Sequence, residues 1–345
     1  MSLPVQRRLL LSSFLLTLVF LLAGRAHAEL VWTPQTGWKV EGGALADVAS
    51  NDSTSAVAFM NKARAAEEKG SRLTAIKYYT RVIKRYPNSV YAPEAQYRLG
   101  NLRLERKQYL KAFEAYQIIA TRYPNTNRYD EIVGKQYHIA SLLLNGERGR
   151  VWGIFPGFTN REKAIGYMEV VLAEAPFSDY APLALMCIAS GHQYLRNNEE
   201  EIDALDRMIN TYPQSVLAPE AYLKLAHAHA ALVEGAYYDQ TSTRDSITYY
   251  EDFMILFPGD NSVVNAEKGL TDMKLVLADS KIKIGDFYFY KRNNYKAARV
   301  FYNEAITIYP GSSVATTAQE RLVLVDAAVK KAETHPKKQK RFFFF

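Results

Sequence analysis

The sequence predicts an all-α fold, a right-handed superhelical solenoid of about six helix pairs followed by one terminal helix. Three observations predict it. A proline that follows an aromatic or small residue recurs at spacings of 37, 52, 37, 45 and 52 residues. Between these prolines, apolar residues recur at helical spacing, and polar breaks divide them into two helices. Hydrophobic residues make up 48% of the 345, enough for a packed core. The recurring prolines are Pro87, Pro124, Pro176, Pro213, Pro258 and Pro310.

The first 28 residues have the pattern of a secretory signal peptide. Two arginines precede the apolar run 9–22, which is too short to favour a membrane-spanning helix. Cleavage after the small residues Ala26 and Ala28 would make Glu29 the first residue of an exported chain. An uncleaved membrane anchor is the alternative.

Four segments follow from these patterns. Residues 1–28 are the predicted signal peptide, and residues 29–55, which are polar and contain glycine and two tryptophans, are an expected extended lead-in. The solenoid is predicted over 56–333, with its terminal helix at about 313–333 to cover the last apolar face. Residues 334–345 form a basic, phenylalanine-rich tail that we expect to be flexible.

The second helix of each predicted pair has a small residue twelve positions before the proline and a large residue eight positions before it. The small residue permits close approach of the two helices, and the large one is expected to fill the gap to the next repeat. Glu201 occupies the small-residue position of the fourth unit, so that repeat is expected to be irregular or shifted in register. The large residues are Tyr79, Tyr116, Met168, Leu205, Tyr250 and Tyr302.

The charge distribution argues against a nucleic-acid-binding protein. The formal net charge of +7 includes +3 from residues 1–28 and +5 from residues 330–345. The remaining residues therefore have a net charge of about −1, so the basic character belongs to the two ends of the chain.

The sequence contains no motif typical of an enzyme, a cofactor site or a metal site, so we expect a non-enzymatic protein with no cofactor. His227 and His229 are two residues apart, which on a helix makes them point about 200° apart. We therefore expect structural roles for both. Cys187, the single cysteine, lies in an apolar string that predicts a buried structural thiol.

Binding of other proteins is the function that remains. First helices of stacked pairs line a concave groove that suits an extended peptide or a partner helix. Two units share a Gln-Tyr motif in this helix, and tyrosine offers a large contact area with a hydroxyl group. Alternatively, these tyrosines pack between repeats. The candidate groove residues are Tyr97, Arg98, Asn101, Tyr137, His138 and Ser141.

Two sets of residues give a resemblance to known families. The first set falls at the offsets of the tetratricopeptide consensus: Leu99, Gly100, Ala112, Tyr116 and Pro124. The second set is the insertions within 152–176 and 237–258 and the last repeat, 284–312, which are similar to the BamD family of outer-membrane barrel-assembly lipoproteins. This likeness extends over about residues 56–325. Its members are typically lipidated on an N-terminal cysteine, which we do not find here, and usually show five helical pairs.

The resemblance implies a periplasmic adaptor, peripheral to the outer membrane, that acts in β-barrel assembly. Residues near 56–145 would receive C-terminal segments of unfolded barrel proteins, and residues 240–330 would dock on the barrel-assembly machine. The alternative is a general periplasmic tetratricopeptide scaffold in cell-envelope or division complexes.

The C-terminal tail is a candidate contact with a membrane or a partner. Its basic residues precede a run of phenylalanines, a combination that suits an anionic membrane surface. A docking peptide and an unselected tail are the alternatives. The residues proposed for contact are Lys337, Lys338, Lys340, Arg341, Phe342 and Phe345.

Overall fold

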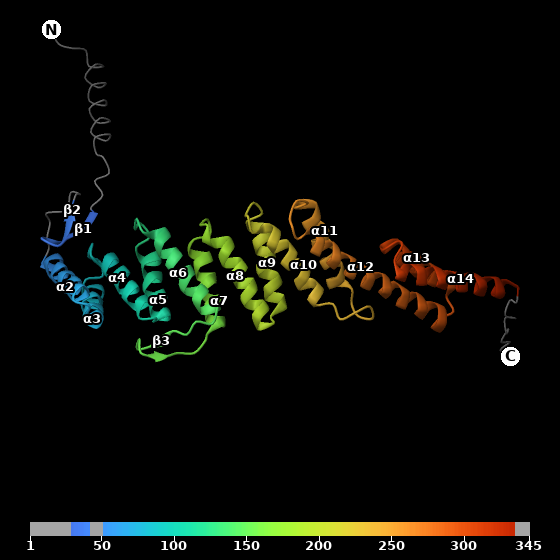
Figure 1. Ribbon diagram of the computed structural model, residues 1–345, viewed down its shortest axis with the longest axis horizontal. Helices are drawn as coiled ribbons and strands as arrows, with labels where there is room; N and C mark the ends of the chain where they lie inside the picture. The colour runs from blue at the N-terminus through green and yellow to red at the C-terminus, as the bar shows by residue number, and fades with distance from the viewer. Residues whose placement is uncertain (1–28, 42–50, 335–345) are drawn as a thin grey trace, which may run out of the picture. The chain divides into compact units, whose positions relative to one another are not determined.

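The structure is a computed structural model and describes residues 29–41 and 51–334. These residues form thirteen α-helices, one π-helical turn and two short β-hairpins, in the order shown in Figure 1. They belong to two compact units, which divide between Asn160 and Arg161. The predicted signal peptide, with Ala26 and Ala28, lies outside the described residues. So do the tail contacts at Lys337, Lys338, Lys340, Arg341, Phe342 and Phe345.

The first unit contains two hairpins and five helices. The strands are β1 (Glu29–Thr33), β2 (Gly37–Glu41), β3 (Arg150–Val151) and β4 (Phe155–Pro156). The helices are α2 (Asn51–Glu68), α3 (Arg72–Arg85), α4 (Ala92–Glu105), α5 (Tyr109–Arg122) and α6 (Tyr129–Leu144). Consecutive helices from α2 to α6 pack against one another along the chain.

The second unit contains the remaining helices. They are α7 (Arg161–Glu174), α8 (Tyr180–Leu195), α9 (Asn198–Thr211), α10 (Ala218–Ala231), α11 (Thr241–Leu256), α12 (Val263–Asp286), the π-helix η1 (Phe287–Lys291), α13 (Tyr295–Ile308) and α14 (Ser313–Thr334). Within the units, the described helices pack as successive pairs, α2–α3, α4–α5, α8–α9, α10–α11 and α12–α13, and α14 packs on α13 as the terminal helix. The predicted all-α repeat fold is confirmed. Its superhelical handedness stays a prediction.

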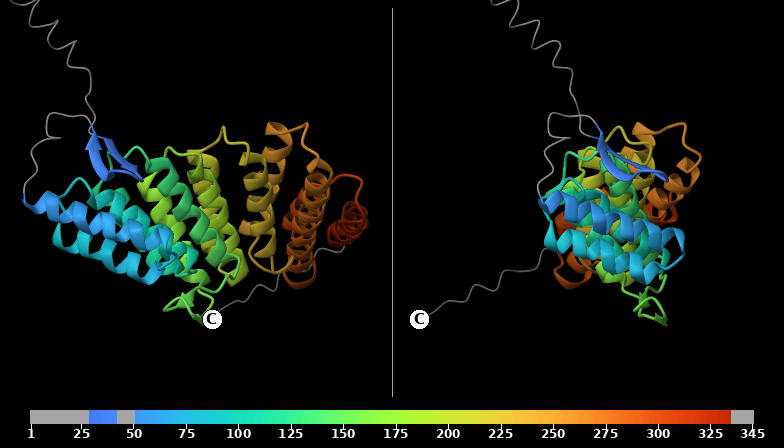
Figure 2. Two further views of the ribbon diagram at one scale, coloured as in Figure 1. Left: turned by 60° about the vertical axis from the view of Figure 1, so that its left-hand side comes forward. Right: turned by 90° about the vertical axis from the view of Figure 1, so that its left-hand side faces the viewer.

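The extended lead-in predicted over 29–55 is wrong in two respects. Residues 29–41 form the β1–β2 hairpin, which lies beside the first helices (Figure 2), and α2 already begins at Asn51. The Trp38 backbone N–H donates to Asn61 Oδ1 at 2.8 Å, and the Trp38 side chain is buried with Met60 in the first core. The Arg64 guanidinium lies 4.5 Å from the centre of the Trp32 ring. Contacts with α2 therefore hold the hairpin.

The small and large positions of the second helices are buried as the sequence predicts, but their partners vary. Tyr116 and Tyr302 face a glycine of their own helix pair, because a Cβ at Gly100 or Gly285 would lie within 2.7 Å or 2.6 Å of the ring. Tyr250 instead faces Gly269 of the next pair. The large residue therefore fills space within a pair at two of these three sites.

Two further expectations are wrong. Helix α9 is regular and has the same 14-residue length as α3 and α5, although Glu201 is buried at its small-residue position. Apolar residues at the following turns keep the register of α9. Cys187 is half-buried, so it is not the fully buried thiol that its apolar neighbours indicate.

Candidate functional site

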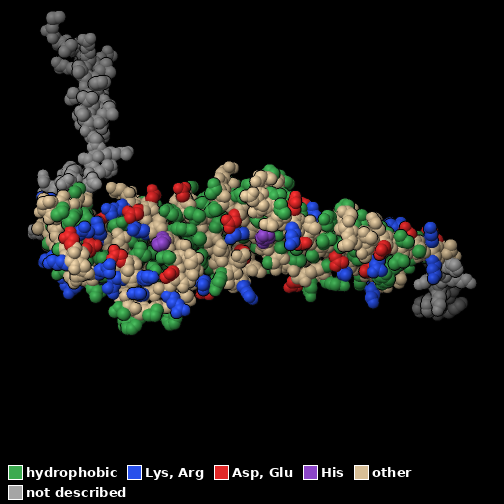
Figure 3. Space-filling view, viewed as in Figure 1, with side chains coloured by type: hydrophobic (Ala, Val, Ile, Leu, Met, Phe, Trp, Pro, Cys, Tyr) green, Lys and Arg blue, Asp and Glu red, His purple; other side chains and the backbone are tan. Residues whose placement is uncertain are grey.

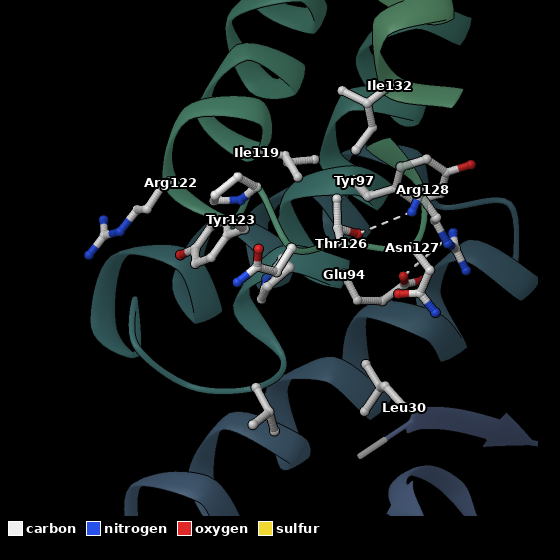
Figure 4. Close-up of a pocket in the computed structure, with 14 residues that line it drawn as sticks. Leu30, Glu94, Tyr97, Ile119, Arg122, Tyr123, Thr126, Asn127, Arg128 and Ile132 are labelled. Atoms are coloured by element: carbon white, nitrogen blue, oxygen red, sulfur yellow. Dashed lines mark hydrogen bonds and ion pairs between the residues drawn. The ribbon is translucent and has the colours of Figure 1, made fainter. Parts of the chain in front are cut away.

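A cavity of about 460 Å³ in the first unit is the candidate binding site (Figure 4). It lies where the chain turns from α3 to α4 and from α5 to α6. Ile119 and Ile132 contribute apolar side chains from α5 and α6, and Leu30 contributes one from β1. The rest of the wall comes from the start of α4 and from the polar corner 123–128. A cavity with apolar and polar walls can hold a short stretch of extended peptide.

The corners form because each second helix ends before a proline. Proline pushes the residue before it out of helical geometry, and Tyr123 has a non-helical backbone at the end of α5. The Tyr123 hydroxyl donates to the Pro87 carbonyl at 2.6 Å, which joins this corner to the preceding one. Tyr212 makes the same bond to the Pro176 carbonyl at 2.7 Å in the second unit.

Glu94 and Arg128 form the charged side of the cavity. The Glu94 carboxylate accepts from Arg98 Nε at 2.7 Å, and its other oxygen lies 3.6 Å from Arg128 Nη1. The Arg128 guanidinium also lies 4.5 Å from the centre of the Tyr97 ring, and Figure 4 shows these two side chains together. The negative charge of Glu94 is therefore matched by two cations.

Tyr97 joins the cavity to α6. Its ring lines the cavity, and its hydroxyl donates to Glu131 Oε1 at 2.5 Å. Burial raises the pKa of Glu131, but the Tyr97 hydroxyl and the charges of Lys135 and Arg128 outweigh this effect and hold the pKa below its ordinary value. Glu131 therefore stays ionised and fixes the hydroxyl.

Arg122 lies at the opposite edge of the cavity from Arg128 (Figure 4). Arg122 Nη2 donates to the neutral Asn88 Oδ1 at 3.2 Å, and the guanidinium lies 5.9 Å from the centre of the Tyr123 ring. This exposed cation can reach an anionic group at the cavity edge.

The structure brings one of the six predicted groove residues, Tyr97, to the cavity. Arg98 pairs with Glu94, and Asn101 accepts a hydrogen bond from the Tyr116 hydroxyl at 2.7 Å. On α6, Tyr137 and Ser141 are half-buried and His138 is exposed. Tyr97 lines the cavity and also packs between repeats, because its hydroxyl bonds Glu131 of α6; its role in peptide binding stays a prediction.

Sequence reasoning missed the polar corner that supplies half of the residues in the cavity wall. The string RYPNTNR, 122–128, has two arginines and two asparagines around the recurring proline. Its Tyr-Pro pair predicts a helix boundary, whereas the predicted groove residues lie on the first helices of the pairs. Its unusual density of side-chain donors was the available signal.

His227 and His229 have packing roles in the second unit. The His227 ring lies 5.6 Å from the Tyr250 ring, and the His229 ring stacks on Tyr249 at 5.3 Å. Burial lowers the pKa of both imidazoles. Over residues 29–41 and 51–334, no group of three or more His, Cys, Asp or Glu residues is placed to hold a metal ion. No helix in the same ranges is long and apolar enough to cross a membrane.

The successive helix pairs and their proline corners define a tetratricopeptide-type repeat protein, and the sequence pattern of the tetratricopeptide repeat matches residues 60–126. The pattern of the YfiO family, described as outer membrane lipoprotein, matches residues 159–341. This is more than half of the sequence, and the chain belongs to this family. It is a family of non-enzymatic scaffold proteins, which confirms both the resemblance and the expected absence of catalysis.

A curated relative that matches this chain has low sequence identity to it. The outer membrane protein assembly factor BamD of Rickettsia prowazekii (strain Madrid E) is 26% identical over 162 residues. The match covers 47% of this chain and 64% of that relative, so the chain spans just under two thirds of its length.

Two solved structures are similar at lower identity. A tetratricopeptide repeat protein from Parabacteroides merdae ATCC 43184 is 14% identical, with 79% of this chain and 99% of that chain covered and a TM-score of 0.31. A thermophilic tetratricopeptide protein of Thermus thermophilus is 16% identical, with 61% and 95% covered and a TM-score of 0.27.

Proposed function

We propose that the protein is a periplasmic adaptor, peripheral to the outer membrane, that binds other proteins during assembly of outer-membrane β-barrels. Membership of the outer membrane lipoprotein family carries this proposal. The similarity to a protein named as an outer membrane assembly factor supports it. The partners are a barrel-assembly membrane protein and unfolded barrel clients.

The cavity in the first unit is the proposed client site. An extended C-terminal segment of a client would place apolar side chains against Val90 and Leu30, the accessible apolar residues of the cavity wall. Its terminal carboxylate would lie at the edge beside Arg122, because Arg128 at the other edge is already near Glu94.

A peptide-binding experiment with the full chain tests the client site. Arg122→Gln should weaken binding of a fluorescent barrel-protein C-terminal peptide about twofold to fivefold, the upper part of the range for an exposed charge pair. Arg85→Gln is the matched control, because Arg85 also precedes a Tyr-Pro pair but does not line the cavity. Amidation of the peptide should abolish the difference between wild type and Arg122→Gln. Equal loss in both variants would contradict the site.

A pull-down from envelope extract tests the proposed pathway. Recovery of a barrel-assembly membrane protein with the wild-type chain is expected. Recovery of cell-wall or division proteins alone would favour the general periplasmic scaffold instead.

A further inference from the structure

The β3–β4 hairpin exposes a cluster of large apolar side chains. Figure 1 shows the hairpin projecting from the helices of the first unit, and Figure 3 shows hydrophobic side chains gathered there beside lysine and arginine. Monomeric soluble proteins rarely expose such clusters unless they bind something. The exposed side chains are Val151, Trp152, Ile154, Phe155 and Phe158, with 51% to 94% of their surface accessible.

The hairpin is fixed on the turn between α4 and α5. The Arg150 N–H donates to the Lys107 carbonyl at 2.7 Å, and Arg106 Nη2 donates to the Trp152 carbonyl at 2.7 Å. Gly153 lies against this guanidinium, so closely that a Cβ there would be 2.5 Å from Nη2. These contacts hold the tip in one conformation, which removes an ordering cost from binding.

Trp152 stands at the tip in an uncommon backbone conformation. Its φ is 54°, a left-handed value that bulky residues seldom adopt. Its ring is 70% exposed and meets the edge of the Phe155 ring at a centroid distance of 6.4 Å. The rings of Trp152 and Phe155 therefore lie in solvent at the tip of the hairpin. A smaller residue at position 152 would adopt this backbone conformation with less strain.

Cations surround this aromatic tip. Arg106 and Lys107 lie on the α4–α5 turn, Arg148 lies just before the hairpin, and Arg150 begins its first strand. Lys107 Nζ lies 3.8 Å from Glu147, and Arg148 and Arg150 are exposed. The apolar tip is therefore bordered by net positive charge.

We propose that the β3–β4 hairpin binds an anionic lipid surface. Trp152, Phe155 and Phe158 would enter the headgroup region, where aromatic rings are favoured, and the arginines would contact lipid phosphates. A protein partner is less suited, because these side chains project from a narrow tip rather than form a broad surface. None of the five exposed hairpin residues lines the peptide cavity.

Flotation of the full chain with vesicles tests the hairpin. The wild type should float with vesicles of phosphatidylcholine and phosphatidylglycerol, and much less with phosphatidylcholine alone. Exchange of Trp152, Phe155 and Phe158 for serine should reduce partitioning at least about tenfold, given the apolar area removed. The matched control exchanges three exposed aromatics of the second unit for serine, Phe177, Tyr237 and Tyr238, and should float like the wild type.

A single conservative substitution gives a second test, which does not require that the protein with three substitutions still folds. Trp152→Phe should keep vesicle binding but lose most of the blue shift in tryptophan emission that the wild type shows with anionic vesicles. Wild type that remains in solution with both vesicles would overturn the proposal. Equal flotation of the wild type and the hairpin variant would also overturn it, because the tail or another surface would then carry the binding.

Discussion

Glycine and tyrosine fit together at several places in the repeats. Gly100 leaves room for the Tyr116 ring, which is fully buried and donates through its hydroxyl to Asn101. Glycine weakens the interior of a helix at most positions. It is favoured at position 100 because the Tyr116 ring occupies the space that a side chain would need. The tetratricopeptide offsets locate this glycine in the sequence, and the ring contact explains it.

Gly100→Ala should lower the free energy of unfolding by about 1–3 kcal/mol, because the new methyl group displaces a buried ring. Gly166→Ala in α7 is the matched control, since a Cβ there meets no atom within 4 Å. That change should raise the free energy of unfolding by up to about 1 kcal/mol through helix propensity. Urea unfolding measures both, and stabilisation by Gly100→Ala would contradict the packing argument.

Glu201 gives a prediction about pH. Burial raises the pKa of its carboxyl above the ordinary 4.5, and Lys224 opposes the shift only in part. The unfolded chain therefore ionises this group more easily than the folded chain, so its charge costs stability above the folded pKa. Below pH 4.5 the group is protonated in both states and the cost disappears.

Glu201→Gln should therefore raise the free energy of unfolding at neutral pH, with a gain that shrinks as the pH falls towards 4.5. Denaturant curves at a series of pH values measure this gain. The exposed neighbour Glu200→Gln should show little effect at any pH. A gain that grows at lower pH would show that the sign is wrong.

At the scale of elements, the proline corners connect one helix pair to the next. Tyr212 is half-buried, and its hydroxyl bond to the Pro176 carbonyl spans two corners of the second unit. The Tyr-Pro pair predicts the end of a helix from sequence alone. It does not predict the bond, because the acceptor lies 36 residues away.

Tyr212→Phe should lower the free energy of unfolding by about 0.5–1.5 kcal/mol, the usual worth of one hydrogen bond. Thermal unfolding of the full chain measures the change. Tyr86→Phe is the control, since Tyr86 closes the first described helix pair and has no earlier proline corner to reach. An equal loss of stability in both variants would show that the effect does not come from the hydrogen bond to Pro176.

The elements that the sequence predicts well are those with strong local patterns. Helical spacing and proline stops locate the helix pairs, and the terminal helix begins at Ser313 as predicted. The two hairpins have no such pattern, since each strand has five residues or fewer. Their conformations depend on distant groups, such as Asn61 for β2 and Arg106 for the tip after β3. The cavity likewise combines residues of three segments, of which sequence reasoning found only Tyr97.

At the scale of the whole molecule, each unit has a core of its own. Met60 is fully buried in the first unit, and Val325 is fully buried in the second with Tyr302. Repeat proteins draw their stability from each repeat and its nearest neighbours. Damage to one core should therefore stay local.

Met60→Ala should reduce local stability by about 2–5 kcal/mol. Native-state hydrogen exchange should show the loss of protection in α2 to α4, with α13 and α14 unchanged. Val325→Ala should give the reverse pattern. An equal loss of protection in both units after either change would indicate one cooperative unit instead.

At four of the five intervals, the residue before the recurring proline is a tyrosine in a 37-residue repeat and lacks a hydroxyl in a longer one. Tyr123 and Tyr212 close intervals of 37 residues, and both hydroxyls reach the previous corner. Ala175 and Phe257 close longer intervals and have no hydroxyl to satisfy, whereas Tyr309 closes a 52-residue interval and keeps one. Since a buried hydroxyl without an acceptor is costly, lengthening a repeat favours the loss of this tyrosine. Insertion of a loop into a 37-residue repeat should therefore destabilise the protein less when the tyrosine before the proline is also changed to phenylalanine.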